Sequence, residues 1–412
     1  MTDEADVVVV GGGPAGTSTA FGLARAGIAV TLVDRAHFPR AKACAESLSP
    51  QAARIFDLMQ VLPDVERAGG AQLVGVRVRS PGGVEFEGRF EAGHGYRGFR
   101  DRGLSLPRRD LDAILLSAAR RAGADVREGW RVTELLRDKS GRVRGVGGLD
   151  GDGRKARLSA RVVVGADGLR SVVARELGLA RRSRLPRRFA FVAHFTAVTG
   201  IGDHGEMHVA RDGYVGLADV GQGRTSVALV VPAAVARAAS HGAARFLKGW
   251  IDAQPQLAPR FVRATRISDV LTTGPFASHA RRAWAPGAVL VGDAADFFDP
   301  FTGEGVYAAL RGGELAMPFV AEATRAGDAR AADRALATYA RVQHREFRGK
   351  RIVEKLVGLA VASPLLLDQA ARVLKRRRDM SDLLIGVTGD FVPASEVLRT
   401  RFLLALMRPV PR

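Results

Sequence analysis

The stretch DVVVVGGGPAG at residues 6–16 decides the fold. Its first part is almost wholly apolar, which predicts a short strand buried in a parallel sheet. The turn that follows carries Gly11-x-Gly13-x-x-Gly16, and residues 17–26 then have helical spacing. In such a turn the first glycine makes the bend, the second lets the backbone approach a pyrophosphate, and the third lets the helix pack closely on the strand. The stretch therefore predicts a strand, a phosphate-binding turn and a helix.

A second strand at residues 29–34 follows that helix and ends in Asp34. A carboxylate at this position can accept hydrogen bonds from a ribose diol. The start of the helix directs free N–H groups and the positive end of its dipole toward phosphate. The two strands and the helix together predict a dinucleotide-binding unit.

The composition is that of a globular protein. The chain has 412 residues, of which 47% are hydrophobic and 25% charged, and this range excludes disordered, collagen-like and disulfide-rich proteins. Its length predicts two or three domains. The single cysteine, Cys44, excludes an intrachain disulfide and a cysteine-rich metal site, and no histidine pair has metal-ligand spacing beside a carboxylate. We therefore expect no metal centre.

The chain is strongly basic, with a formal net charge of +19. A solvated basic surface is the simplest interpretation. The functional interpretations are attraction to an anionic membrane, to an acidic substrate or to an acidic carrier protein. We expect no nucleic-acid partner, because the sequence lacks zinc-finger spacing, an RNP motif and a basic zipper, and only 6% of its residues are aromatic.

The rest of the chain changes its pattern several times. Residues 73–79 and 84–87 alternate in polarity and predict a half-exposed hairpin, and residues 187–231 hold further strands between glycine turns. An apolar parallel strand is expected at residues 288–291, and residues 314–412 have mostly helical spacing. The predicted fold class is α/β, with a Rossmann-like domain, an inserted antiparallel β-sheet that covers the substrate, and C-terminal helices. The predicted boundaries are 1–72, 103–180 and 268–345 for the first domain, 73–102 and 181–267 for the sheet domain, and 346–412 for the helical region.

Two further motifs follow apolar strands. Residues 162–171, VVVGADGLRS, place Asp167 in an Asp-Gly turn before a polar helix start. Residues 291–305, VGDAADFFDPFTGEG, put Asp293 at the carboxyl end of a strand, and a glycine-rich loop then leads into a helix at about Gly305. Asp293 can accept hydrogen bonds from a polyol, and the start of that helix can stabilise negative charge on a flat ring.

These three motifs, in this order, resemble the FAD-binding motifs of the flavoprotein superfamily that contains the class A monooxygenases and the geranylgeranyl reductase-like proteins. The resemblance spans about residues 5–315 and implies an FAD-dependent oxidoreductase. Arg108, in LPRRDLD at residues 106–112, also matches the superfamily's Arg-x-x-Leu/Phe-Asp pattern. The residues that the resemblance assigns to FAD are Gly11, Gly13, Pro14, Ala15, Gly16, Asp34, Arg35, Arg40, Arg108, Asp167, Asp293, Pro300, Gly303 and Gly305. No second strand–GxGxxG–helix unit is visible, so NAD(P)H is expected to bind only transiently as the reductant.

The resemblance leaves several reactions open. Monooxygenation is favoured, in which NAD(P)H reduces FAD and oxygen is transferred to a hydrophobic aromatic or polyketide-like molecule of secondary metabolism. The alternative is reduction or dehydrogenation of an alkene in a lipid or isoprenoid. Residues 34–46, DRAHFPRAKACAE, indicate this alkene chemistry because they resemble the FPRxKxCG stretch of geranylgeranyl reductase-like proteins. Ala45 replaces that glycine, and only Tyr214 matches the family's YxWxFP pattern.

Two further hypotheses rest on weaker signals. ESL at residues 46–48 is similar to flavin-dependent halogenases, whose WxWxIP motif is absent from this sequence. A non-enzymatic flavin electron carrier at the membrane surface is the last hypothesis.

No general base is identifiable from the sequence. The candidate residues of the substrate pocket are Cys44, Glu46, His194, His208, Tyr214 and Glu304. Cys44 also suits a buried apolar position, and the two histidines also fit a structural role in the inserted sheet. Arg40 and Lys42 are expected to hold a phosphate or a substrate carboxylate.

We expect a cytoplasmic protein, because the sequence shows no targeting segment. Its longest apolar run, residues 356–367, is shorter than the about 20 residues that span a bilayer. The basic C-terminal region is available for peripheral contact with an anionic membrane. The oligomeric state stays open.

Overall fold

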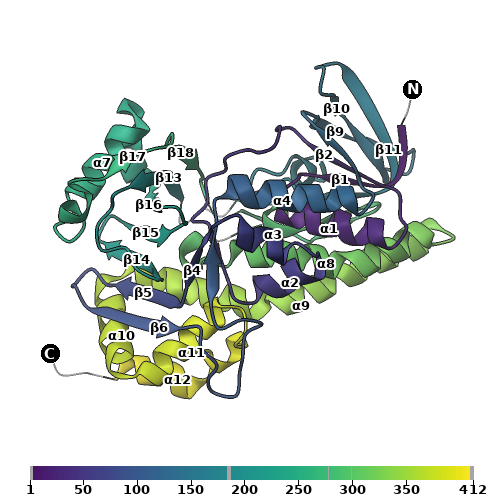
Figure 1. Ribbon diagram of the computed structural model, residues 1–412. Helices are drawn as coiled ribbons and strands as arrows, with labels where there is room; N and C mark the ends of the chain where they lie inside the picture. Colours follow the sequence, from purple (N-terminus) through teal and green to yellow (C-terminus); the bar gives the residue numbers. More distant parts are fainter. Residues whose placement is uncertain (1–2, 183–186, 277, 298, 409–412) are drawn as a thin grey trace.

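The computed structural model in Figure 1 has two halves, and a sheet of mixed parallel and antiparallel strands forms one of them. The structure describes residues 3–182, 187–276, 278–297 and 299–408. The central strand β1 (Asp3–Val10) pairs in parallel with β2 (Val30–Asp34) and β11 (Lys155–Gly165). The four valines of β1 are almost wholly buried, which is why this run forms the middle of the sheet. The remaining strands are β8 (Asp125–Glu128), β9 (Arg131–Arg137), β10 (Val143–Leu149), β20 (Trp284–Ala285) and β21 (Ala288–Leu290).

Helices pack on this sheet around the main hydrophobic core. The helix α1 (Pro14–Arg25) follows β1 directly and contacts α4 (Arg108–Arg121) and α8 (Gly305–Arg325). These three helices lie along one face of the sheet in Figure 1. Smaller elements complete this half: α2 (Ala52–Leu58), α3 (Leu62–Arg67), α5 (Val172–Glu176), and the short strands β3 (Ser47–Leu48), β4 (Ala71–Leu73), β7 (Gly103–Ser105), β12 (Ala180–Arg182), β19 (Ser278–Ala280) and β22 (Asp296–Phe297).

A second sheet draws its strands from two separate parts of the chain. Its order is β17-β13-β16-β15-β14-β5-β6, with β18 beside β13. The hairpin β5–β6 adds to the edge of the later strands through β14, and this one contact is parallel, whereas the other pairings are antiparallel. The α/β fold class predicted from the sequence is confirmed. The bounds are β5 (Gly75–Arg79), β6 (Glu85–Arg89), β13 (Arg188–Thr196), β14 (His204–Ala210), β15 (Gly213–Asp219), β16 (Arg224–Pro232), β17 (Thr265–Arg266) and β18 (Leu271–Thr273).

One face of the second sheet is covered by helix. Leu247 and Trp250 of α7 (Ala243–Asp252) pack with Phe191 and Leu229 of the sheet, and α6 (Ala233–Ala236) lies beside them. Successive side chains of a strand point to opposite faces. The alternate residues of these strands therefore face the nucleotide-type half of the molecule.

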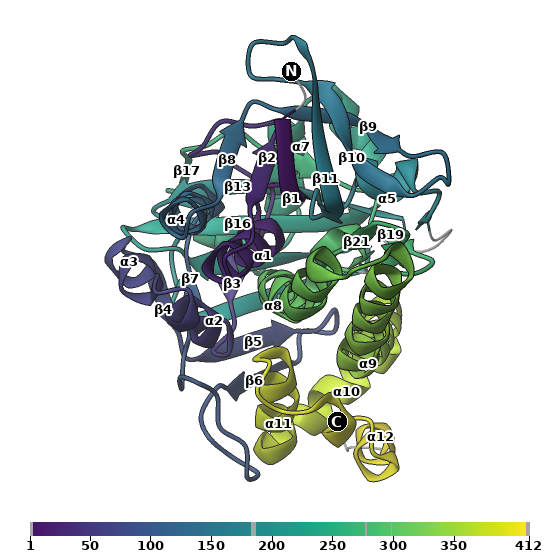
Figure 2. The same ribbon diagram turned by 90° about the vertical axis from the view of Figure 1, so that its right-hand side faces the viewer.

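The C-terminal region is helical, as predicted. The long helix α9 (Ala329–Ala362) packs on α8 and ends before Pro364, which has no N–H to continue it and opens α10 (Pro364–Arg376). The helices α10 and α11 (Arg378–Thr388) cover β6, and α12 (Thr400–Met407) packs on α10. Figure 2 shows these helices gathered at one end of the molecule. The domain boundaries stay predictions.

Candidate active site

The glycine-rich turn between β1 and α1 holds a cradle at the start of the helix. A Cβ on Gly11 would lie 2.4 Å from the carbonyl oxygen of Ala166, and a Cβ on Gly16 would lie 1.8 Å from that of Gly11. The first and third glycines are therefore fixed by the packing of strand, turn and helix. A Cβ on Gly13 would meet only guanidinium nitrogens of Arg40 and Arg108, each 3.9 Å away. This open position at a helix N-terminus fits a phosphate group.

One buried carboxylate holds both of those arginines. Asp112 accepts two hydrogen bonds of 2.8 Å from Arg108, and it also forms an ion pair of 3.0 Å with Arg40. Asp112 is fully buried, and Arg108 is the first residue of α4. Arg40 also lies 3.9 Å from a carboxylate oxygen of Asp34, so two carboxylates hold the two guanidinium groups beside the turn. Guanidinium groups held in this way are suitable donors to a pyrophosphate.

Asp34 stands at the end of β2, where a ribose would lie. Its two carboxylate oxygens accept the backbone N–H groups of Gly12 at 2.7 Å and Ala36 at 2.8 Å. Each oxygen keeps a second lone pair for a ligand hydroxyl. The neighbouring Arg35 is exposed and does not line the pocket.

The second motif places Asp167 at the start of α5. One of its oxygens accepts the N–H groups of Val172 at 2.6 Å and Val173 at 3.2 Å. The other oxygen is buried and has no partner among the described residues. Burial raises the pKa of Asp167, although its hydrogen bonds oppose the rise. An unsatisfied buried acceptor beside the pocket residue Gly168 fits a hydroxyl of a bound cofactor.

The third motif forms the opposite side of the pocket. Burial raises the pKa of Asp293, whereas the charges of Lys42 and Arg108 act against the rise. Burial also lowers the pKa of Lys42, so the two groups form a partly compensated pair. A Cβ on Gly303 would come no closer than 3.8 Å to Ser47, and one on Gly305 would meet nothing within 4 Å. The loop before α8 therefore leaves room for a flat ring.

Three of the predicted pocket residues meet beside this loop. The buried Glu46 has a left-handed backbone, with φ of 65°. One of its carboxylate oxygens accepts the N–H of Arg108 at 3.0 Å, and the other lies 2.6 Å from Nε2 of His194. The Glu46 N–H points to the sulfur of Cys44 at 3.3 Å. The structure thus joins Cys44, Glu46 and His194 in one cluster.

Tyr214 belongs to a different wall of the pocket. Its hydroxyl donates to Asp299 at 2.5 Å, and Arg188 forms an ion pair of 2.9 Å with the same carboxylate. Burial, reinforced by the charge of Asp299, raises the pKa of Tyr214 well above its usual value. The tyrosine therefore stays protonated and holds the loop before α8 against the second sheet.

Helix α9 supplies one wall of the pocket that was not predicted from the sequence. Gln343, Phe347, Lys350 and Glu354 line the pocket at spacings of four, three and four residues. Lys350 lies 3.4 Å from Glu304 and forms a second ion pair with the buried Asp390. The helical spacing was visible in the sequence, but nothing local indicates which face of α9 meets the pocket.

Burial also raises the pKa of two acids beside this wall, Glu354 and Glu304. Burial raises the pKa of Glu354 to about 8, and the negative charges of Glu304, Asp296 and Asp299 add to the rise. Burial also raises the pKa of Glu304, which Lys350 opposes. The pocket therefore contains a carboxyl group that holds a proton at neutral pH.

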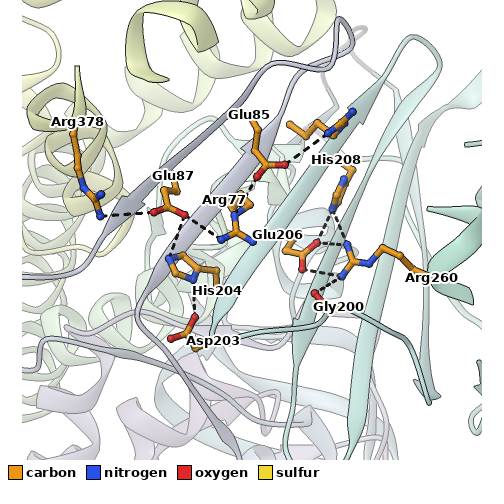
Figure 3. Close-up of polar contacts among 11 residues, drawn as sticks. Arg77, Glu85, Glu87, Gly200, Asp203, His204, Glu206, His208, Arg260 and Arg378 are labelled. Carbon is orange, nitrogen blue, oxygen red and sulfur yellow. Dashed lines mark hydrogen bonds and ion pairs between the residues drawn. The ribbon is translucent and has the colours of Figure 1, made fainter. Parts of the chain in front are cut away.

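His208 lies outside the pocket, in the network of Figure 3. Its Nε2 is 2.7 Å from Glu206, and Arg260 pairs with the same carboxylate at 2.5 Å. Against the effect of burial, these two partners lower the pKa of Glu206 to about 2. Both Glu206 and Met207 of β14 are among the residues that line the pocket, whereas His208 is not. The side chains of Glu206 and His208 alternate with that of Met207 along the strand and meet at Arg260.

The predicted site residues divide into two groups. Those that line the pocket are Gly13, Pro14, Ala15, Arg108, Asp293, Pro300, Gly303 and Gly305, together with Cys44, Glu46, Tyr214 and Glu304. Those that stand outside its lining are Gly11, Gly16, Asp34, Arg35, Arg40, Asp167, His194 and His208. The inserted sheet and the segment around β19 add an apolar part, which includes Ala190, Val192, Leu217, Ala228, Val230 and Phe276.

Comparison with known proteins agrees with this geometry. A family model described as "FAD binding domain" matches residues 4–354. Menaquinone reductase from Mycolicibacterium smegmatis is 28% identical over 411 residues, which cover 95% of this chain and 93% of that protein. Digeranylgeranylglycerophospholipid reductase from Methanothrix thermoacetophila is 31% identical over 334 residues, which cover 78% and 79%.

Solved structures share the fold. A flavin-dependent brominase aligns with a TM-score of 0.81 and 21% identity, over 94% of this chain and 93% of that one. A geranylgeranyl bacteriochlorophyll reductase-like protein from Thermoplasma acidophilum aligns with a TM-score of 0.73 and 22% identity, over 99% and 96%. At these identities the structural likeness describes the fold and not the reaction.

Proposed function

The chain belongs to the FAD-binding domain family of FAD-dependent oxidoreductases, and on that premise we propose that it saturates a carbon–carbon double bond in the polyprenyl chain of a lipid. The observation that carries the proposal is the apolar part of the pocket, formed by side chains such as Val192, Val230 and Phe276. A polyprenyl chain offers no hydrogen-bonding group, and such a wall binds it by removing apolar surface from water.

The sequence relatives favour the same substrate class. The two reductases compared above are named for menaquinone and for a digeranylgeranyl glycerophospholipid, and both molecules carry polyprenyl chains. The menaquinone reductase matches this chain over almost its whole length. Alkene reduction therefore replaces monooxygenation as the reaction that we favour, and monooxygenation becomes the second candidate.

The chain's own residues would place FAD with its reactive ring at the apolar part of the pocket. Arg40, Arg108 and the start of α1 would hold the pyrophosphate, and Asp34 would accept hydrogen bonds from the ribose. The start of α8 would stabilise negative charge on the ring. Bound FAD would supply the two electrons that alkene reduction needs, with NAD(P)H as the proposed reductant.

Saturation of a double bond also needs a proton at the second carbon. Glu354 lines the pocket and holds a proton at neutral pH, because burial raises its pKa to about 8. Its carboxyl group is the proposed source of that proton, and Lys350 and Glu304 beside it would help to restore it from solvent.

The test is an assay of the FAD-loaded protein with a polyprenyl lipid, with and without oxygen. We expect a product heavier by two hydrogen atoms, formed without oxygen when dithionite or NAD(P)H is supplied. A product heavier by one oxygen atom, formed only in air, would contradict the proposal and support monooxygenation. The Gly13→Val variant, which fills the phosphate cradle, is the control without bound cofactor.

A further inference from the structure

The C-terminal helices carry a concentration of exposed apolar side chains. Among the described residues, eight of the twelve exposed large apolar side chains lie between Ile352 and Met407. Leu365 is 83% exposed, and Leu359 is 64% exposed. Single exposed apolar residues need no explanation, whereas a group of them marks an interaction surface.

This group lies where α9 turns into α10. Leu359 is in the last turn of α9 and Leu365 in the first turn of α10, on the two sides of a bend of 112°. Gln369 of α10 donates to the backbone oxygen of Arg408, which brings the end of α12 beside α10. Figures 1 and 2 both show α10 and α12 together at the far end of α9. We call this surface the apical patch, and it consists of Leu359, Leu365, Leu366, Leu404 and Met407.

Basic residues share the same surface. Arg372 follows Leu365 by seven residues, so it lies on the same side of α10, and Lys375 is three residues further along. Lys375 is exposed, as is Arg401 on α12. The one acidic residue of α10 is Asp368, and its carboxylate accepts the N–H of Gly82 at 2.8 Å. The apical patch is therefore apolar and bordered by positive charge.

We propose that the apical patch docks on an anionic lipid bilayer. Its leucines would lie at the boundary between headgroups and acyl chains, and Arg372, Lys375 and Arg401 would face lipid phosphates. Charge favours this partner over a second copy of the chain, because a second copy would bring the same basic border and the same net charge of +19. Among the described residues no single helix is long and apolar enough to cross a membrane, whereas α9 and α10 pass that test of length and composition only when taken together across their bend.

Helix α9 connects the apical patch with the pocket. Glu354 lines the pocket, and Leu359 follows five residues later, about 8 Å along the helix. A lipid held at the apical patch would thus have its chain within about two helical turns of the pocket. This delivery of substrate rests on the proposed function, whereas binding to the bilayer does not.

The experiment is co-sedimentation of the FAD-loaded protein with vesicles. One set contains phosphatidylcholine alone, and the other adds about one third phosphatidylglycerol. We expect binding to the anionic vesicles at low salt, with much weaker binding at high salt and to the neutral vesicles. No binding to anionic vesicles at low salt would overturn the proposal.

Two double variants locate the contact. Leu365→Ser with Leu366→Ser should weaken binding at least roughly tenfold, because the variant lacks two apolar side chains that would be buried at the bilayer boundary. Its control is Leu58→Ser with Val262→Ser, two residues exposed elsewhere at 57% and 81%. Equal losses in the variant and its control would place the contact elsewhere and refute the apical patch.

The charge variant is Arg372→Gln with Lys375→Gln, and its control with the same net charge is Lys139→Gln with Lys155→Gln. At about 1 kcal/mol per basic residue, or roughly fivefold each, the first pair should weaken binding roughly 25-fold and the control far less. A dimer that only the Leu365 and Leu366 variant dissociates, without vesicle binding, would assign the patch to a second copy and overturn the proposal.

The outcome separates the two proposals. Vesicle binding without alkene reduction would refute the proposed function and keep the docking surface. Reduction of a detergent-dispersed lipid without vesicle binding would keep the proposed function and refute the docking surface.

Discussion

The protonated Glu354 on α9 makes stability depend on pH in a direction that can be calculated. Burial raises its pKa from the usual 4.5 to about 8 in the folded chain. The folded state therefore keeps a proton that the unfolded state releases, and the unfolded state binds fewer protons between these two values. The free energy of unfolding must then fall as pH rises through this window, and the slope fades to zero within about one pH unit below 4.5 and above 8.

The size of the effect follows from the same two values. A difference of about 3.5 pKa units corresponds to about 5 kcal/mol in total, at 1.36 kcal/mol per unit. Between pH 5 and pH 8 the part that is lost is about 3–4 kcal/mol. The change Glu354→Gln keeps the shape of the side chain and removes its titration. We expect the variant to gain about 3–4 kcal/mol relative to the wild type between these two pH values.

The assay is urea unfolding of the FAD-loaded protein at several pH values, followed by tryptophan fluorescence. The matched control is Glu322→Gln, because Glu322 is an exposed glutamate on α8. Its curve should run parallel to the wild-type curve. Parallel curves for wild type and Glu354→Gln would refute the reasoning, because Glu354 would then be ionised in the folded state and could not hold a proton for the substrate.

Three further predictions concern the cofactor cradle and the second sheet. Gly13→Val should lower FAD affinity at least roughly tenfold by flavin fluorescence titration and leave apoprotein unfolding unchanged, because its Cβ has room in the chain but enters the phosphate cradle. Arg108→Met should lower the free energy of unfolding by about 3 kcal/mol, because it leaves Asp112 with Arg40 alone, whereas the exposed Arg109→Met should change it little. Glu206 has a pKa of about 2, so it should add about 3 kcal/mol of stability above pH 4.5 that is lost as pH falls toward 2. Glu206→Gln should remove this acid dependence in chemical unfolding, and an unchanged slope would contradict the assignment.

The sequence alone determined the parts of the site that are local in the chain. The buried valine run, Gly11, Gly13 and Gly16 predicted β1, its turn and α1, because each conformation depends on neighbouring residues. Asp34 and Asp293 could be placed for the same reason, since each ends or follows an apolar strand. The α/β fold class and the FAD-binding family follow from these signals, and both are confirmed.

Only the tertiary structure decided which residues form the walls of the pocket. Glu46 and His194 are 148 residues apart in the chain, and only the docking of the second sheet on the first brings them to 2.6 Å. The same docking turns His208 away from the pocket toward Arg260, because alternate residues of a strand face opposite sides. The raised pKa of Glu354 depends on its burial and on the negative charges of Glu304, Asp296 and Asp299. Charge state is set by surroundings assembled from distant segments, and the order of residues along the chain does not contain that information.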